Sequence, residues 1–246
     1  MEIFDDLEVE QDRIEAVLAG LDAAAWTSPS GAPGWSVADV VLHLAQSEEA
    51  VVASVGGISL LDSLPATVAG ATSIDDVMAR WVAAEREAPA AIFDRWRKAR
   101  RAAVAALRGA EPESRLPWAA APLKPTALAT TRLAEHWAHA LDVVDPLGID
   151  FPDTDRLRHI AWLAHRSLPY GFSVAGEEPH DVFCDLTGPD GTQWTYGDAT
   201  AESQITGSAG AFCRVGAQRL SPEASGLVTS GPHADVALRV LRNYAA

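Results

Sequence analysis

The stretch Arg132–Asp145 reads RLAEHWAHALDVVD and favours a helix, because Ala, Leu, Glu and His fill it. Thr126 or Thr130 can begin this helix, and Pro146 and Gly148 can end it. We predict that this helix carries the chemistry of the protein and that the rest of the chain completes the site.

Glu135 and His139 lie four residues apart, and on a helix they therefore share one face. A carboxylate and an imidazole stacked in this way can bind one divalent metal ion, with a third ligand from elsewhere in the chain. The alternative is a solvent-exposed pair that adds only roughly 0.2–0.5 kcal/mol. His136 is a further possible ligand, although His139 shares a face with Glu135 better than His136 does.

The composition indicates a folded protein that acts on a small molecule. The chain has 246 residues, of which 48% are hydrophobic, so it can form one large domain or two small ones. Its formal net charge of −15 disfavours a phosphate-binding surface, and the basic run Arg95–Arg101 fits a solvated helix face. We therefore expect a small-molecule substrate and no nucleic-acid partner.

We expect a cytoplasmic location and no membrane contact. No apolar run approaches the roughly 20 residues of a spanning helix. The first residues, MEIFDDLEVEQDR, are acidic where a signal peptide is basic. Cys184 and Cys213 are too few for a disulfide framework, so we expect both to be reduced. The sequence leaves open whether the protein is a monomer or a homodimer.

The first 172 residues contain long helical patterns. Ser36 is an N-cap followed three residues later by Asp39, and Ser73 is followed in the same way by Asp76. Pro89 forces a kink or break in the third pattern. The predicted helices cover residues 3–21, 37–55, 74–107 and the region around 132–145, followed by a helix from Arg156 to about Leu168.

The last third of the chain changes to short strands. His180–Leu186 and Gln193–Tyr196 are rich in β-formers and flank a Gly-Pro-Asp-Gly turn, which predicts a hairpin. Further elements are predicted at 201–206 (strand), 208–220 (helix) and 235–244 (helix). We therefore predict a two-domain α+β fold, with an up-and-down four-helix bundle at 1–172 and a small α+β domain at 173–246.

His43 lies in the helix predicted at residues 37–55. By itself it can be a core histidine that is hydrogen-bonded to a neighbour. Metal sites in four-helix bundles are built from side chains that project inward from facing helices, so His43 can also meet Glu135 and His139. Two nitrogens and one carboxylate oxygen suit Zn²⁺ with an open fourth position.

Two segments carry a resemblance to a known family. Residues 34–48, GWSVADVVLHLAQSE, contain Trp-Ser-x-x-Asp-x-x-x-His, and residues 134–143, AEHWAHALDV, contain Glu-x-x-x-His. In this combination they resemble the DinB-like superfamily of metal-binding four-helix bundles, and within it the mycothiol-dependent maleylpyruvate isomerase family. The resemblance implies that His43, Glu135 and His139 bind a divalent metal ion.

The C-terminal part also resembles the sterol-carrier-like α+β domain of that family, in which a Thr-Gly-x-Ala turn leads into a helix ending in Arg. The segment TGSAGAFCRVGAQR, from Thr206, places Arg219 at this end, and Arg214 competes for the role. Gln218 stands where the family usually has Gly. The resemblance implies that one of these arginines binds a substrate carboxylate or the polar groups of a thiol cofactor.

The resemblance implies a metal-dependent enzyme that uses a low-molecular-weight thiol such as mycothiol, as an isomerase or an S-transferase. A coordinated thiol is deprotonated, which produces a nucleophile at neutral pH. The alternatives are a hydratase, hydrolase or cyclase without a thiol, and a non-catalytic ligand-binding protein with a structural metal. Asp142, near His139 on the same helix, either orients the imidazole or is a charge on the helix surface.

Overall fold

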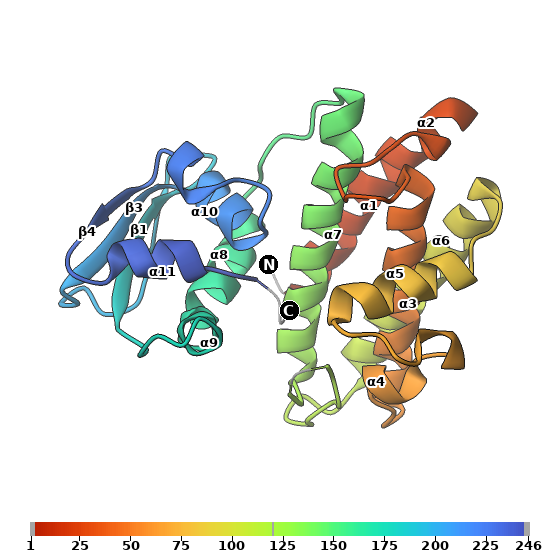
Figure 1. Ribbon diagram of the computed structural model, residues 1–246, viewed down its shortest axis with the longest axis horizontal. Coiled ribbons are helices and arrows are strands. Elements are labelled where there is room, and N and C mark those ends of the chain that lie inside the picture. Colours follow the sequence, from red (N-terminus) through yellow and green to blue (C-terminus); the bar gives the residue numbers. More distant parts are fainter. Residues whose placement is uncertain (1–2, 120, 244–246) are drawn as a thin grey trace. The chain divides into compact units, whose positions relative to one another are not determined.

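The computed structural model describes residues 3–119 and 121–243, which form two compact units (Figure 1). The first unit ends at Phe151 and is helical. The second begins at Pro152 and combines helices with a four-stranded sheet. The predicted fold class, a helical bundle followed by a small α+β domain, is confirmed.

Four long helices build the first unit. α1 (Ile3–Ala19) packs along α7 (Pro125–Leu147), and α3 (Val37–Val55) packs along α6 (Pro89–Gly109). Apolar residues recur along each helix at three- and four-residue steps, so each helix turns one stripe toward the others. The buried core includes Leu7, Val41, Trp96, Leu128 and Leu133.

Shorter helices surround the bundle: α2 (Ala23–Thr27), α4 (Leu60–Ser63), the 3₁₀ turn η1 (Ala66–Val68) and α5 (Ile74–Ala84). The predicted break at Pro89 is confirmed, since α5 ends at Ala84 and α6 begins at Pro89. Proline suits the first position of a helix because its missing N–H is not needed there. The sequence did not predict α2 and α4, because helices of about one turn leave no periodic pattern.

The start of α3 follows the predicted capping pattern. The Ser36 hydroxyl accepts the N–H of Asp39 at 3.2 Å, and Asp39 Oδ2 accepts the N–H of Ser36 at 2.9 Å. Two of the N–H groups that a helix start leaves unpaired are thereby satisfied. The cap fixes the first turn of α3, and His43 lies about two turns further along.

The end of α7 involves a proline inside the helix. The sequence predicts that Pro146 and Gly148 end the helix. In the structure, the helix continues through Pro146 to Leu147 and is capped by Gly148, which has a left-handed φ of 65°. Because Pro146 has no N–H, the carbonyl of Asp142, four residues earlier, loses its helical donor. The N–H of Gly31 donates to that carbonyl at 2.7 Å. The proline therefore creates an attachment point for the loop before α3.

The second unit contains a mixed sheet of order β2-β1-β3-β4, in which β1 and β3 are parallel and the other pairs antiparallel. The hairpin and the third strand are confirmed, whereas β4, of three residues, was too short to predict. Tyr244, where the last predicted helix ends, lies outside the described residues. The elements are α8 (Leu157–Arg166), α9 (Leu168–Val174), β1 (Val182–Thr187), β2 (Gln193–Tyr196), β3 (Ser203–Ser208), α10 (Ala209–Gly216), η2 (Pro222–Ala224), β4 (Val228–Ser230) and α11 (Ala234–Val240).

The boundary between the units differs from the one predicted between residues 172 and 173. The second unit begins about 20 residues earlier, at Pro152, because α8 packs against α10 and α9 packs against α11. Gly171 shows how tight the second contact is, since a Cβ there would lie 2.4 Å from the carbonyl oxygen of Val240. The helix predicted from Arg156 to about Leu168 and assigned to the bundle thus packs, as α8, within the α+β unit, and α9 was not predicted.

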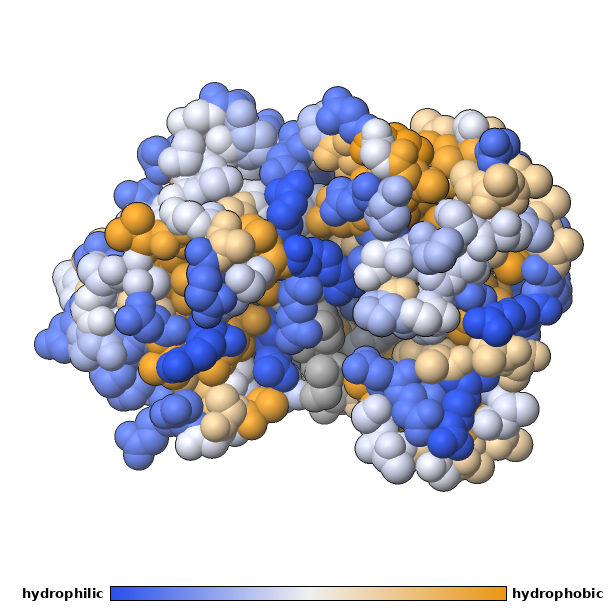
Figure 2. All heavy atoms as spheres, turned by 45° about the horizontal axis from the view of Figure 1, so that its top comes forward, coloured by the Kyte–Doolittle hydropathy of each residue, from blue (hydrophilic) through white to orange (hydrophobic). Residues whose placement is uncertain are grey.

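On the face drawn in Figure 2, hydrophilic and hydrophobic side chains are interspersed over both units. Among the described helices, none combines the length and the apolar character that crossing a membrane requires.

Replacing Ser36 by alanine tests the capping box. We expect Ser36→Ala to lower the free energy of unfolding by about 1 kcal/mol, because the N–H of Asp39 loses its acceptor. Chemical denaturation followed by circular dichroism measures the change. Thr27→Ala is the control, since its hydroxyl donates to carbonyls of the short helix α2. An equal loss in the two variants would contradict a specific role for the cap.

Candidate metal centre

Three predicted ligands come together between two helices. His43 projects from α3, and Glu135 and His139 project from α7. Glu135 Oε2 lies 3.8 Å from His43 Nε2 and 3.5 Å from His139 Nε2, and one ligand atom from each residue lies within 4.8 Å of the others. Within residues 3–119 and 121–243, this is the one group of three His, Cys, Asp or Glu side chains with such geometry.

The spacing of these atoms suits a shared cation. Two ligand atoms bound to a tetrahedral Zn²⁺ at about 2.0–2.1 Å lie about 3.3 Å from each other. The two separations from Glu135, 3.5 and 3.8 Å, are close to this value and longer than a normal hydrogen bond. Two imidazole nitrogens and one carboxylate oxygen are also a donor set that Zn²⁺ accepts. The residues therefore fit one divalent ion.

The three side chains are only partly accessible. The side chain of Glu135 is 25% exposed, and those of His43 and His139 are 10% and 12% exposed. A structural zinc site is closed by four protein ligands, whereas a catalytic site keeps one position open. Three ligands with this remaining exposure leave room for a fourth ligand from solution.

The charge states of Glu135 and His43 favour metal binding. Burial alone would raise the pKa of the Glu135 carboxyl, but the nearby imidazoles of His139 and His43 and the charge of Arg132 hold that pKa well below its usual range. Burial lowers the pKa of His43 below its usual value, and the nearby Glu135 carboxylate opposes this only in part. The groups are thus a carboxylate and a neutral imidazole, which are the forms that bind metals.

Asp142 orients one of the histidines. His139 Nδ1 donates to Asp142 Oδ2 at 2.9 Å, so Nε2 of His139 is left to face Glu135. The Asp142 side chain is 3% exposed, which fits an acceptor for the imidazole and not a charge on the helix surface. Burial alone would lower the pKa of His139, but Asp142 and Glu135 raise it above its usual value. A more basic imidazole is a stronger metal ligand.

Trp35 covers both histidines. Its ring centroid lies 5.2 Å from that of His43 and 6.4 Å from that of His139. The loop that carries Trp35 is attached to α7 by the bond from Gly31 to the Asp142 carbonyl. A Cβ at Gly31 would lie 3.0 Å from Asp142 Cα, so only glycine fits this approach without displacement. The sequence alone does not predict this packing of Trp35, because the position of the ring depends on the loop contact.

His43 does not make the hydrogen bond expected of an ordinary core histidine. Its Nε2 faces Glu135, and its Nδ1 has no hydrogen-bond partner within the described part of the chain. Packing against Trp35 and an edge-to-face contact with the His139 ring, at a centroid distance of 4.9 Å, hold the imidazole in place. The geometry therefore favours the ligand interpretation of His43.

His136, the alternative ligand, has a different role. Trp96 Nε1 donates to His136 Nε2 at 3.3 Å, and His136 Nδ1 donates to the Arg132 carbonyl at 2.8 Å. Burial lowers the pKa of His136 to about 3, so the imidazole is neutral. Both ring nitrogens are engaged in the bundle core, and we therefore assign His136 to packing.

The two candidate arginines belong to the second unit. Arg214 donates two hydrogen bonds to the Asp153 carboxylate, at 2.7 and 2.9 Å, and Arg219 donates to the Ala217 carbonyl at 2.7 Å. Gln218 has a left-handed φ of 58°, which glycine adopts more readily than other residues. Substrate binding by Arg214 or Arg219 stays a prediction.

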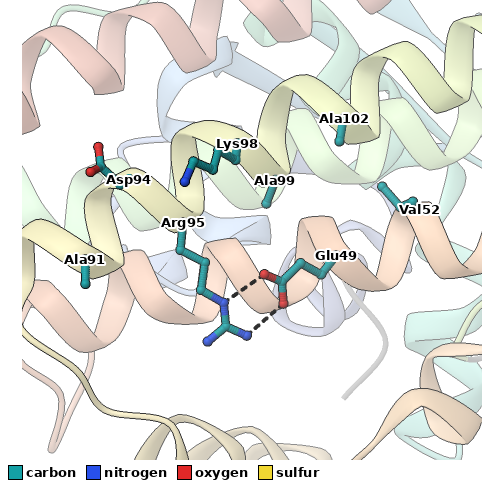
Figure 3. A pocket seen from close by; sticks show the side chains of 8 residues that line it. All are labelled: Glu49, Val52, Ala91, Asp94, Arg95, Lys98, Ala99 and Ala102. Atoms are coloured by element: carbon teal, nitrogen blue, oxygen red, sulfur yellow. Dashed lines mark hydrogen bonds and ion pairs between the residues drawn. The ribbon is translucent and has the colours of Figure 1, made fainter.

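Two grooves of the first unit have no candidate ligand in their linings. One, of about 650 Å³, lies between α3 and α6, where Arg95 donates two hydrogen bonds to Glu49 at 2.8 and 2.7 Å (Figure 3). The other, of about 570 Å³, is bordered by Trp35, Asp39 and Arg86. The second groove thus shares only Trp35 with the surroundings of the metal centre.

Comparisons with known proteins agree with this architecture. A family model described as "Mycothiol maleylpyruvate isomerase N-terminal domain" matches residues 7–144. Uncharacterized proteins from two strains of Mycobacterium tuberculosis are each 35% identical over 220 residues, which cover 87% of this chain and 84% of theirs.

Two crystal structures share the fold. One is the structure of a mycothiol-dependent maleylpyruvate isomerase, and the other is that of a mutant of it. Each aligns with this chain with a TM-score of 0.62 at 15% sequence identity, and the alignment covers 94% of this chain and 95% of the chain in the crystal structure. At this level of identity, the match concerns the arrangement of the elements.

Metal analysis tests the three ligands. We expect about one divalent ion per chain in protein purified without a histidine tag, and much less in His43→Ala and Glu135→Ala, because two ligands bind weakly. Elemental analysis after dialysis measures the content. His159→Ala, a substitution in the second unit, is the control and should retain the ion. Equal metal content in wild type and both ligand variants would contradict the site.

The bond between Asp142 and His139 gives a second prediction. We expect Asp142→Asn to weaken metal binding by about 10-fold or more, because the imidazole loses the carboxylate that orients it and raises its basicity. Competition with a chromophoric chelator measures the dissociation constant. Asp145→Asn, at an exposed position of the same helix, should leave it unchanged. If both variants bind as wild type does, Asp142 has no such role.

Proposed function

Because this chain belongs to the mycothiol maleylpyruvate isomerase N-terminal domain family, we propose that it is a metal- and thiol-dependent enzyme acting on a small molecule. The family match over residues 7–144 confirms the resemblance carried by residues 34–48 and 134–143. In this proposal His43, Glu135 and His139 hold one divalent cation, and Zn²⁺ is the cation that the donor set suits best.

The observation that carries the proposal is the convergence of three ligands that leaves a fourth position available. The solved relatives of the same fold are described as mycothiol-dependent, which supports a low-molecular-weight thiol for that position. When bound, the cation would keep a thiol deprotonated at neutral pH and so supply a nucleophile. A cytoplasmic location fits this chemistry, because thiols stay reduced there.

The residues of this chain have distinct tasks in the proposal. Glu135 contributes the negative charge of the donor set, and Asp142 keeps Nε2 of His139 directed at the ion. Trp35 packs on both imidazoles and limits the access of water. Arg219 or Arg214 would bind a carboxylate of the substrate through a two-pronged guanidinium contact.

The proposed reaction is isomerisation or S-transfer. For isomerisation, the bound thiol would supply a nucleophile that adds reversibly to a cis double bond conjugated to a carbonyl, so that the bond could rotate before the thiol leaves and the trans double bond forms. For S-transfer, the thiol would instead replace a leaving group and stay on the product.

A three-arm assay tests the thiol dependence. The zinc-loaded protein is incubated with maleylpyruvate, or with an alkyl halide as a model electrophile, in the presence of mycothiol, glutathione or no thiol. We expect turnover with a thiol and none without it. Turnover that is equal in all three arms would contradict the proposal and indicate hydratase, hydrolase or cyclase chemistry.

The size of the effect follows from the thiol pKa. A free thiol with a pKa near 8.5 is only about 3% thiolate at pH 7, so full ionisation raises the nucleophile concentration about 30-fold. We therefore expect His43→Ala to lower the thiol-dependent rate about 30-fold or more. His159→Ala serves again as the control. A His43→Ala rate within twofold of wild type would show that the reaction does not use the site.

A further inference from the structure

A buried ion pair lies between the same two helices that carry the metal ligands. Arg132 of α7 donates from Nε to Glu48 Oε1 of α3 at 2.7 Å. The Arg132 side chain is 4% exposed, and that of Glu48 is fully buried. Burial of two charged groups is costly unless they are paired, so this contact is a specific feature of the bundle interior.

The pair and the metal ligands form two successive links between α3 and α7. On α3, Glu48 follows His43 by about one and a half turns; on α7, Arg132 precedes Glu135 by about one turn. His136, next to Glu135, joins the pair, since its Nδ1 lies 3.7 Å from Glu48 Oε1 and donates to the Arg132 carbonyl. The Glu48–Arg132 ion pair therefore contacts the turn of α7 that carries Glu135.

Stability alone does not account for the pair. Two apolar side chains of similar volume would hold α3 against α7 at least as well, because replacing a buried ion pair in this way is often neutral or stabilising. Glu48 Oε2 and Arg132 Nη2 also have no hydrogen-bond partner in the described part of the chain. What a directional, charge-assisted hydrogen bond adds is a fixed axial position and rotation of one helix against the other.

We propose that Glu48 and Arg132 are positioning residues that hold α3 and α7 in the register where His43 faces Glu135 and His139. This inference rests on the proposed metal centre but not on thiol chemistry. Within the described residues, ring packing against Trp35 and His139 holds the His43 imidazole and no hydrogen bond at Nδ1 does, so its distance to Glu135 also depends on the placement of α3 against α7. The pair fixes that placement from one side.

The test replaces both charges and measures the geometry of the bound metal. In the double variant Glu48→Leu/Arg132→Met, no charge is left unpaired, so we expect the bundle to fold. We expect its affinity for Co²⁺ to fall about 10- to 100-fold, the usual loss when groups that orient metal ligands are removed. We also expect the visible absorption of bound Co²⁺ to change in position and intensity. Glu48→Gln, which keeps the side-chain shape, should shift both measurements in the same direction by less.

The matched control is Arg100→Met. Arg100 is 4% exposed and pairs with Asp12 and Glu15, so it connects α6 with α1 and touches no candidate ligand. We expect this variant to lower the thermal midpoint but to bind Co²⁺ with the affinity and spectrum of wild type. Thermal unfolding of all variants separates loss of stability from loss of geometry.

The Co²⁺ spectrum reports the coordination geometry, so it separates lost positioning from the loss of the Arg132 charge that acts on Glu135. Wild-type affinity and spectrum in the folded double variant would overturn the positioning role, and so would an equal spectral change in Arg100→Met. If the double variant does not fold, Glu48→Gln decides by the same two measurements. Failure of wild type itself to bind Co²⁺ would overturn the metal centre. Absence of thiol-dependent turnover in a protein that binds Co²⁺ would overturn only the proposed reaction.

Discussion

Asp142 accepts two hydrogen bonds on which the candidate metal centre depends. Its side chain accepts from His139 Nδ1, and its carbonyl accepts from the N–H of Gly31. The carbonyl is available because Pro146 cannot donate to it. The first bond orients a ligand, and the second attaches the loop whose Trp35 packs on His43 and His139. Pro146 thus contributes to the site indirectly, because it leaves the Asp142 carbonyl available to accept the hydrogen bond from Gly31.

Those parts of the fold that depend on local sequence patterns could be predicted from the sequence. The long helices follow from their apolar spacing, the start of α3 from Ser36 and Asp39, and the hairpin from β-formers around a turn. The unit to which α8 belongs could not be predicted, because an amphipathic helix does not specify which neighbour it covers, and α9, of seven residues, is too short to leave a periodic pattern. The strand β4 is too short to carry a pattern.

The candidate site likewise combines residues that local spacing predicts with residues whose roles depend on long-range contacts. Glu135 and His139 follow from their spacing on one helix, whereas the assignment of His43 needed the family resemblance as well. Trp35 and the Glu48–Arg132 pair could not be predicted, because their roles arise from contacts between residues far apart in the chain. The proposed function likewise combines two sources. The ligand geometry supports a metal with an open position, and the family supports a thiol to occupy it.

X-ray absorption at the zinc edge, recorded with and without mycothiol, tests whether His43, Glu135 and His139 hold a zinc ion whose fourth position takes a thiol. Without the thiol, we expect nitrogen and oxygen neighbours at about 2.0–2.2 Å, including two imidazoles. With mycothiol, we expect one added sulfur neighbour at about 2.3 Å. A spectrum that mycothiol leaves unchanged, or one that shows four protein ligands, would contradict a thiol-binding zinc site.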